Sequence, residues 1–488
     1  MLKISRKDIA AVKTDMAVLF VSENKSLYKG SATADLVKRA KTYPEFDGKA
    51  GSELLFYDIS GVAAGRVLFC GLGKAKDINS ESLRAAAGRA VKKGIGMKLS
   101  SIALCVPEVD LPDPEELPSA GPVMEGACLA NHCFDHYRGK KEQKPFKKIV
   151  ICGDSGAGVI DDLASRISLI CKGTLLAREW VSMPSNDKRP DLFARSIVKA
   201  SAKEELKAVV MDDRDMKKNG MHAILAVGAG SSRRPKMVVL EYSPKSWNKS
   251  VVLVGKGVTF DSGGINLKPS SGISEMKMDM AGAAAVAATV ITAARLNYGC
   301  RITGVMPIVE NMPSGDATRP GDIVKTYSKK TVEIDNTDAE GRLILADALS
   351  YAEKEYKPDM IIDMATLTGA CVVALGEKLA GVFSPDEDLS AGIVDSSKRT
   401  HERCWNMPLP EDYKKLLKSD FADIKNVSST RWGGAITAAL FLSEFVKTKK
   451  WCHIDIAGPA YAAKGGDYAG PGGTGFGVRL LLDFLEGV

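Results

Sequence analysis

Residues 251–285 read VVLVGKGVTFDSGGINLKPSSGISEMKMDMAGAAA, and this stretch decides the expected fold. It opens with a near-continuous apolar run, which is typical of a strand covered on both faces of a sheet. Two Gly-rich turns follow, and an Ala-rich helical pattern closes the stretch. Because α/β proteins place their sites in loops at the carboxyl ends of strands, we expect these loops to be functional. Their charged residues include Lys256, Asp261, Lys268 and Asp279.

Strand-like and helix-like segments alternate along the rest of the chain, which predicts an α/β fold. We interpret residues 1–165 as a smaller N-terminal α/β domain and residues 166–190 as a connecting helix and linker. Residues 191–488 would form a larger catalytic α/β/α domain with a mixed, mostly parallel central sheet. Its strand candidates include AVVM at 208–211, AILAVG at 223–228, KMVVLEY at 236–242, ITGVMPIV at 302–309 and CHIDIAG at 452–458.

The composition of the 488 residues, 45% hydrophobic and 26% charged, is that of a soluble globular protein with more than one domain. The first fifteen residues carry charges where a signal peptide needs an apolar run, and the Ala-rich stretch from Ala281 is short for a bilayer. We therefore expect a cytoplasmic protein. Its ten cysteines include no CxxC pair, which favours buried thiols over a disulfide framework.

Three weaker patterns leave alternatives open. The basic run RGKKEQKPFKK at 138–148 is either a solvated loop or a contact for an anionic partner such as nucleic acid. His132 and His136 stand four residues apart in a helical pattern, which would allow a metal pair but leaves no evident third ligand. The GDSG string within 152–158 lacks plausible His and Asp partners, so it favours a glycine turn over a serine-protease site.

A second charged stretch, EIDNTDAEGRL at 333–343, lies between a strand end and a helix start. Its Asp338 and Glu340 would point the same way in an extended segment. If they converge with Asp261 and Asp279, the four carboxylates repel one another unless cations neutralise them. Oxygen ligands suit Mg²⁺, Mn²⁺ or Zn²⁺, and shared carboxylates favour two metal ions.

Arg342 stands at the start of the helix that follows, where the helix dipole disfavours a cation. A bound anion would explain this position, held by the guanidinium and by amides of the helix start. The alternative is an ion pair with a nearby acid such as Asp335.

The blocks GKGVTFDSGGINLKP, MKMDMAGAAA and NTDAEGRLILADAL resemble the signature blocks of the leucine aminopeptidase (cytosol aminopeptidase) family of two-metal exopeptidases. The resemblance extends over nearly all of about residues 170–488, whereas the first 165 residues resemble the family's N-terminal domain only loosely. It implies a cytoplasmic homohexamer that releases N-terminal amino acids, preferably leucine and other apolar residues, from peptides with a free N-terminus. It also implies two divalent ions in each subunit, Mn²⁺ or Zn²⁺, with Mg²⁺ as a further option.

The resemblance also assigns roles to residues. The tighter metal would be held by Lys256, Asp261, Asp279 and Glu340, and the more exchangeable one by Asp261, Asp338 and Glu340. Lys268 and Arg342 match the catalytic pair, with a bicarbonate ion on Arg342. The pocket for the substrate side chain would be lined by Met276, Thr366, Gly369 and Ala457. Two positions depart from the family pattern, where Lys329 replaces a common glycine and Ala460 replaces a bulkier residue.

Two rival interpretations remain beside this one. Some bacterial members of the family also bind DNA, so the run at 138–148 keeps an additional DNA-binding role of the assembled oligomer open. A two-metal phosphoesterase would also use clustered carboxylates. It would commonly use histidines as well, and it gives Lys256 no purpose as a ligand.

Overall fold

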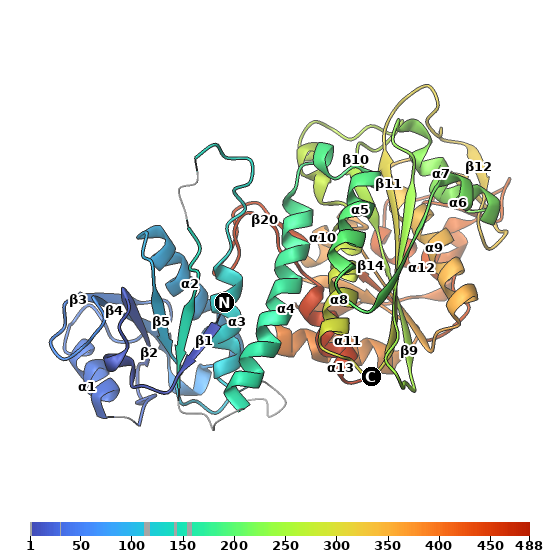
Figure 1. Cartoon of the computed structure of the whole chain (residues 1–488). Coiled ribbons are helices and arrows are strands. Elements are labelled where there is room, and N and C mark those ends of the chain that lie inside the picture. Colours follow the sequence, from blue (N-terminus) through green and yellow to red (C-terminus); the bar gives the residue numbers. More distant parts are fainter. Residues whose placement is uncertain (1, 30, 112–117, 141–143, 154–158) are drawn as a thin grey trace. The chain divides into compact units, whose positions relative to one another are not determined.

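The structure, a computed structural model, describes residues 2–29, 31–111, 118–140, 144–153 and 159–488 (Figure 1). The chain forms two compact units, the first made of Met1–Leu175 with Lys464–Pro471 and the second of Leu176–Ala463 with Gly472–Val488. One chain segment passes from the first unit to the second inside the long helix α4 (Val159–Ser182). The connecting segment predicted at 166–190 includes this point, and its boundaries remain a proposal.

The first unit is built on a six-stranded sheet in the order β1-β6-β5-β2-β4-β3. Neighbouring strands run parallel except at the β3–β4 edge, where they are antiparallel. The strands are β1 (Leu2–Ser5), β2 (Met16–Ser22), β3 (Glu53–Tyr57), β4 (Arg66–Gly73), β5 (Ile102–Cys105) and β6 (Ile149–Cys152). The helices are α1 (Ser31–Ala40), α2 (Ser80–Gly96), α3 (Ala120–Ala130) and the first part of α4. Every residue of β2 is buried, as its unbroken apolar run MAVLFVS predicts for a central strand.

A segment from near the end of the chain, Lys464–Pro471, completes this first unit. The Asp467 carboxylate lies 3.1 Å from the Arg89 guanidinium, and the Lys92 ammonium donates to the carbonyl oxygen of Gly466 at 2.7 Å. These contacts join residues nearly 400 positions apart in the sequence, so no local pattern predicts them.

The second unit contains a nine-stranded sheet in the order β16-β15-β18-β14-β9-β11-β8-β7, with β10 paired to β11. Its centre is parallel, because β18, β14, β9, β11 and β10 run the same way, whereas β15 pairs with β18, and β8 with β11, antiparallel. The strands are β7 (Leu206–Met211), β8 (Lys236–Tyr242), β9 (Ser250–Gly255), β10 (Gly257–Asp261), β11 (Arg301–Asn311), β14 (Met360–Ala365), β15 (Ala380–Phe383), β16 (Cys404–Asn406) and β18 (Trp451–Asp455).

Two short sheets and nine helices accompany this sheet among the residues that the structure describes. The short strands are β12 (Asp322–Lys325), β13 (Thr331–Ile334), β17 (Ile424–Lys425), β19 (Tyr461–Ala462) and β20 (Gly472–Gly473). The helices are α5 (Pro190–Ser201), α6 (Asp213–Asn219), α7 (His222–Val227), α8 (Ala281–Arg295), α9 (Glu340–Tyr356), α10 (Gly369–Leu375), α11 (Glu387–Thr400), α12 (Gly434–Ser443) and α13 (Val478–Glu486).

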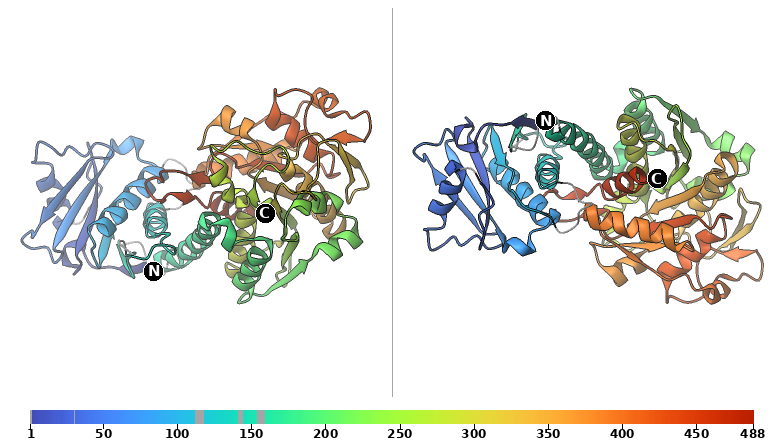
Figure 2. Two further views of the ribbon diagram at one scale, coloured as in Figure 1. Left: turned by 90° about the horizontal axis from the view of Figure 1, so that it is seen from above. Right: turned by 90° about the horizontal axis from the view of Figure 1, so that it is seen from below.

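Helices cover both faces of the large sheet, as Figures 1 and 2 show. On one face, Val254 of β9 and Val305 of β11 share a buried core with α9. On the other face, Gly304 of β11 lies so close to α8 that an added Cβ would sit 3.0 Å from Val290. The predicted smaller α/β domain and larger α/β/α domain with a mixed, mostly parallel sheet are therefore confirmed.

The Ala-rich helix α8 lies inside the second unit. The segment Ile273–Arg295 is long and apolar enough to cross a membrane, yet 83% of its apolar window is buried within the protein. Burial of this kind is what a core helix of a globular domain shows. Its small side chains let the helix approach the sheet closely, because alanine adds little volume between backbones.

The strand predicted at 223–228 is wrong, because AILAVG forms helix α7. A short apolar run does not distinguish a buried strand from a buried helix. The first free N–H groups of this helix, those of Ala223 and Ile224, donate to the carboxylate of Asp347 at 2.9 and 3.0 Å. Its start signal therefore comes from a residue more than 120 positions away.

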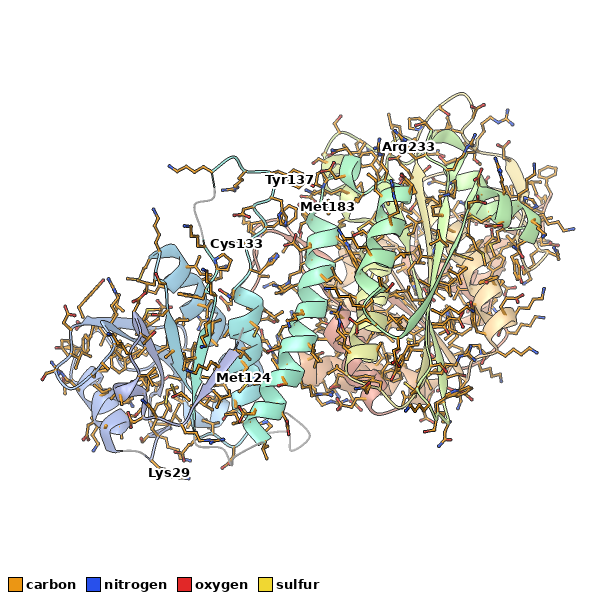
Figure 3. The ribbon with its side chains drawn as sticks, in the orientation of Figure 1. Lys29, Met124, Cys133, Tyr137, Met183 and Arg233 are labelled. Carbon is orange, nitrogen blue, oxygen red and sulfur yellow. The ribbon has the colours of Figure 1, made fainter. Side chains whose placement is uncertain are left out.

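The predicted helical pair of His132 and His136 is also wrong, because α3 ends at Ala130. Asn131 leaves the helical conformation, and its side chain exchanges two hydrogen bonds with the backbone of Phe146 at 2.7 and 2.8 Å. Cys133 and Tyr137, labelled in Figure 3, lie on the non-helical segment that follows. The two histidines therefore do not share a helix face.

All ten cysteines are free thiols, and nine of them are buried, Cys133 being the half-buried exception. The expectation of buried thiols without a disulfide framework is confirmed. The GDSG string falls mainly on residues 154–158, which lie outside the described residues, and so do residues 141–143 of the basic run.

Candidate metal centre and active site

The functional loops meet because the central strands of the second unit are parallel. Lys256 follows β9, Thr366 follows β14, and Asp455 ends β18, which is the next strand in the sheet. Asp455 stands in register with Ala365 of β14, directly before Thr366. Asp261 ends β10 at the same edge, paired with Asn311 at the end of β11. Loops at the carboxyl ends of parallel strands thus gather the predicted residues.

Lys256 lies at the centre of one half of the site and is only 3% exposed. Its Nζ is 2.8 Å from Asp279 Oδ1 and 2.9 Å from Glu340 Oε1. It also donates to the carbonyl oxygen of Thr366 at 2.7 Å. The side chain lies against the first turn of α9, where a Cβ added to Gly341 would sit 2.5 Å from Lys256 Cε. A side chain at 341 would therefore displace the Lys256 side chain from this position.

Lys268 lies at the centre of the other half. Its Nζ is 2.8 Å from Asp261 Oδ2 and 2.6 Å from Asp338 Oδ1. Asp261, Asp338 and Glu340 each offer an oxygen atom, and these three atoms lie within 4.8 Å of one another. The structure therefore brings together the four carboxylates and both lysines that the sequence predicted for the site.

The electrostatics of this cluster are those of an acid-rich, buried site. Burial raises the pKa of Asp261, and the neighbouring Glu340 raises it further. Burial likewise raises the pKa values of Asp279 and Asp338. Burial disfavours the charged form of Lys256, but Asp279 and Glu340 outweigh this effect and raise its pKa. Cations are therefore strongly favoured among these side chains.

The donor set fits divalent metal ions. Four carboxylates face only two ammonium groups in the cluster, which leaves a deficit of positive charge. Asp279 Oδ2 and Glu340 Oε2 are buried and accept no hydrogen bond from any residue that the structure describes. Buried carboxylate oxygens without a donor are costly unless a cation binds them. Hard oxygen ligands of this kind suit Mn²⁺, Mg²⁺ or Zn²⁺.

Arg342 lies in the first turn of α9 and is buried, with Nη1 donating to the carbonyl oxygen of Asn426 at 2.8 Å. The alternative pairing of Arg342 with Asp335 is wrong, because Asp335 pairs with Lys425 at 3.0 Å. Burial lowers the pKa of Arg342 to about 10, although Glu340 and Asp455 oppose that change. Its buried Nε finds no acceptor among the described residues, which fits the expectation of a bound anion.

Asp338 and Glu340 converge for a different reason than the sequence suggested. They do not lie on an extended segment, because Asp338 is in a turn and Glu340 is the first residue of α9. The N–H of Asp338 donates to the side chain of Asn336 at 2.8 Å, which shapes this turn. The turn and the helix start direct both carboxylates to Asp261.

The four predicted pocket residues lie on segments that adjoin the site, and Thr366, Ala457 and Met276 take part in hydrogen bonds there. The Thr366 hydroxyl donates to Asp279 Oδ1 at 2.7 Å, and Gly369 begins α10. The N–H of Ala457 donates to Asp455 Oδ1 at 3.1 Å. The fourth residue, Met276, lies in the 3-10 helix Ile273–Met278, and its carbonyl oxygen accepts the N–H of Asp279 at 3.3 Å.

Sequence reasoning missed three polar residues that support the site, namely Asn311, Asn426 and Asp455. Asn311 Nδ2 donates to Asp261 Oδ1 at 2.8 Å and to the carbonyl oxygen of Thr337 at 3.1 Å. Asn311 and Asp455 end buried strands, the same signal that identified Asp261. Asn426 follows only a two-residue strand and carries no such signal.

The glycine that the resemblance implies at position 329 would suit the backbone conformation there. Lys329 has a φ of 76°, in the left-handed region that favours glycine. It lies in the turn between β12 and β13, outside the metal centre.

Comparison with known proteins points in one direction. Residues 175–482 match the model described as "Cytosol aminopeptidase family, catalytic domain", and residues 18–141 match that family's N-terminal domain. The chain is 43% identical to a probable cytosol aminopeptidase of Chlorobaculum tepidum, with 99% of each chain covered. It is 42% identical to one of Cenarchaeum symbiosum, covering 94% of this chain and 93% of the relative.

A solved structure, titled "Bottromycin maturation enzyme BotP in complex with Mn", is similar to the chain over its whole length. The TM-score is 0.85 at 34% sequence identity, covering 97% of this chain and 99% of that one. The similarity therefore includes both units.

Proposed function

We propose that this chain, which belongs to the cytosol aminopeptidase family and is thus a peptidase of the aminopeptidase type, depends on metal ions and releases N-terminal leucine and other apolar residues from peptides. The observation that carries this proposal is the cluster of four carboxylates and two lysines, of which Lys256, Asp261, Asp279 and Glu340 are buried, with carboxylate oxygen atoms left without a hydrogen-bond donor. A manganese complex of a similar protein supports Mn²⁺, and Zn²⁺ and Mg²⁺ fit the same donors.

In this proposal Lys256, Asp261, Asp279 and Glu340 hold one metal ion, and Asp261, Asp338 and Glu340 hold the second. Bound metal ions would lower the pKa of water to near neutrality and polarise the scissile carbonyl. Lys256 must give up its proton to act as a ligand, and the bound ion would displace that proton. The protonated Lys256 described above is then the form that precedes metal binding.

The roles of the side chains follow from their positions. Asp279 Oδ2 accepts the free α-amine of the substrate, which explains exopeptidase action because an internal peptide nitrogen cannot replace an amine. Lys268 stabilises the negative charge that develops on the carbonyl oxygen, the function of an oxyanion-hole donor. Arg342 would hold a bicarbonate ion, which would supply a general base beside the metal centre.

We also propose a cytoplasmic homohexamer, on the basis of family membership. A phosphoesterase is not favoured, because the cluster of Asp261, Asp338 and Glu340 includes no histidine among the described residues. A DNA-binding role of the run at 138–148 stays a hypothesis, and salt-dependent gel shifts with and without that run decide it.

The test is hydrolysis of a panel of aminoacyl amides by the Mn²⁺-loaded protein. Each amide is offered with a free and with an acetylated N-terminus. We expect cleavage of the free forms, fastest for leucyl and other apolar residues, and none of the acetylated forms. Equal cleavage of acetylated and free forms contradicts the role of Asp279, and a preference for charged residues contradicts the proposed specificity.

A further inference from the structure

Asp455 connects two loops that carry predicted pocket residues. It is 1% exposed at the end of β18, and its Oδ1 accepts the N–H of Leu367 and the N–H of Ala457, both at 3.1 Å. Its Oδ2 accepts the hydroxyl of Thr368 at 2.7 Å. One carboxylate thus receives three donors, two from the loop after β14 and one from the loop after β18.

The hydrogen bond to Thr368 extends into helix α10. The Thr368 hydroxyl oxygen also accepts the N–H of Cys371 at 3.0 Å, which caps the helix that Gly369 begins. A Cβ added to Gly369 would meet no atom within 4 Å, so there is open space at this helix start. The orientation of Asp455 therefore determines where this open position lies relative to Ala457.

The same loop is connected to the metal centre at its other end. The carbonyl oxygen of Thr366 accepts from Lys256 Nζ, and the Thr366 hydroxyl donates to Asp279. The loop after β14 is thus held between the metal centre and Asp455.

From this geometry we propose that Asp455 is the positioning residue of the side-chain pocket, fixing the distance between the 366–369 loop and Ala457 and so determining which N-terminal residue fits. The proposal rests on the proposed aminopeptidase function. Asp455 acts through the two loops and does not itself touch the substrate.

Backbone pairing holds the strand at Asp455 on both sides, which makes the proposal testable. The sheet continues past Asp455 by backbone pairing alone, since the N–H of Ile456 donates to the carbonyl oxygen of Ala365 at 2.8 Å. Asp455→Ala therefore keeps the strand but leaves the N–H groups of Leu367 and Ala457 without an acceptor. Asp455→Asn keeps an oxygen for both N–H groups and supplies an NH₂ donor to the Thr368 hydroxyl oxygen.

The experiment compares the full-length wild type with Asp455→Ala, Asp455→Asn and a control, Asp386→Ala. Asp386 also caps a helix, accepting the N–H of Leu389 at 2.8 Å at the start of α11, but lies outside the loops that Asp455 connects. We measure kcat and KM for leucyl and alanyl amides, and manganese content by elemental analysis. Calorimetric titration with L-leucine and L-alanine reports pocket binding without turnover.

We expect Asp455→Ala to raise KM for the leucyl amide and weaken L-leucine binding about tenfold, the scale of an N–H group left unpaired. Discrimination between leucine and alanine should shrink, while manganese content stays that of the wild type. Asp455→Asn and Asp386→Ala should retain the wild-type preference.

Three results would overturn the proposal. Unchanged KM, binding and preference in Asp455→Ala would show that the loops hold their positions without it. Loss of manganese from Asp455→Ala would show that Asp455 supports the metal centre instead of the pocket. Loss of the leucine preference in Asp455→Asn would show that the charge of Asp455 matters, not its geometry. A wild type that binds L-leucine but cleaves no amide refutes the aminopeptidase function alone, because the binding comparison still tests Asp455.

Discussion

The side-chain amide of Asn426 binds both polar groups of the Asn336 backbone, donating to its carbonyl oxygen at 2.7 Å and accepting from its N–H at 3.3 Å. The same amide oxygen accepts the N–H of Asp335 at 2.9 Å. The backbone carbonyl of Asn426 accepts from Arg342, so this one residue fixes both the turn that carries Asp338 and the proposed catalytic arginine. Asn426 is fully buried, so water does not reach the backbone groups that it binds.

We therefore predict that Asn426→Ala lowers both activity and metal affinity. Mutation of a residue that orients metal ligands typically lowers activity or metal affinity by about 10–100-fold. Steady-state kinetics and equilibrium dialysis against Mn²⁺ measure the two effects. Asn219→Ala is the control, because Asn219 makes one exposed hydrogen bond, to the carbonyl oxygen of Asp215. Wild-type manganese affinity in Asn426→Ala would show that the turn holds its shape unaided.

Lys268→Ala tests the predicted oxyanion donor. The ammonium of Lys268 lies between Asp261 and Asp338, within reach of both proposed metal ligands. We expect kcat to fall by roughly 10²–10³, the effect of removing one oxyanion donor, with a smaller change in KM. Lys398→Ala, which removes an exposed lysine paired with Asp395, should leave kcat unchanged. Full turnover by Lys268→Ala would refute this role.

The proposed metal ligands could be identified from sequence because they stand at detectable boundaries. Lys256 and Asp261 follow apolar runs that end in glycine turns, and Asp279 and Glu340 precede helical patterns. These signals are local, since a strand end and a helix start are encoded within a few residues.

The supporting residues could not be predicted in the same way. Asn426 forms hydrogen bonds with residues 84 to 91 positions away in the sequence. Asp455 accepts the N–H of Leu367, which is 88 positions away. These contacts arise from the order of strands in the sheet, which a single sequence does not specify. The strand prediction at 223–228 is wrong for the same reason, because the N–H groups at the start of helix α7 are capped by the distant Asp347.

Removal and return of the metal tests the centre as a whole. Strong chelation should abolish activity, and Mn²⁺ should restore it and raise the thermal midpoint, because a ligand that binds only the folded state stabilises it. Glu340→Gln should lose both responses, since Glu340 contacts Lys256 and belongs to the three-carboxylate group. Unchanged rates in a preparation shown by elemental analysis to lack metal would contradict the centre.

Asp347 gives a prediction about stability. Its buried carboxylate accepts the N–H groups of Ala223, Ile224 and Tyr327, at 2.9, 3.0 and 2.7 Å. Asp347→Asn turns an NH₂ group toward backbone donors and should lower the free energy of unfolding by about 1–3 kcal/mol. Thermal midpoints measured by calorimetry give the loss.

The pH dependence of that loss distinguishes the carboxylate from a simple packing role. Burial raises the pKa of Asp347 to about 7, although the three N–H donors oppose the change. The folded state therefore retains a proton that the unfolded chain releases near pH 4, and the stability this gives is lost as pH rises through about 7. Asparagine does not titrate. The difference in the free energy of unfolding between wild type and Asp347→Asn should therefore be largest at pH 5 and smaller at pH 8.

Asp359→Asn is the matched control for this titration. Asp359 accepts the N–H of Ser250 at 2.8 Å, a bond that lowers its pKa, so it is ionised in both states from pH 5 to pH 8. Its stability contribution is therefore present throughout that range and is lost only at lower pH. The gap for Asp359→Asn should stay constant from pH 5 to pH 8. A constant gap for Asp347→Asn as well would mean that Asp347 is ionised in the folded protein across this range, its three N–H donors outweighing burial.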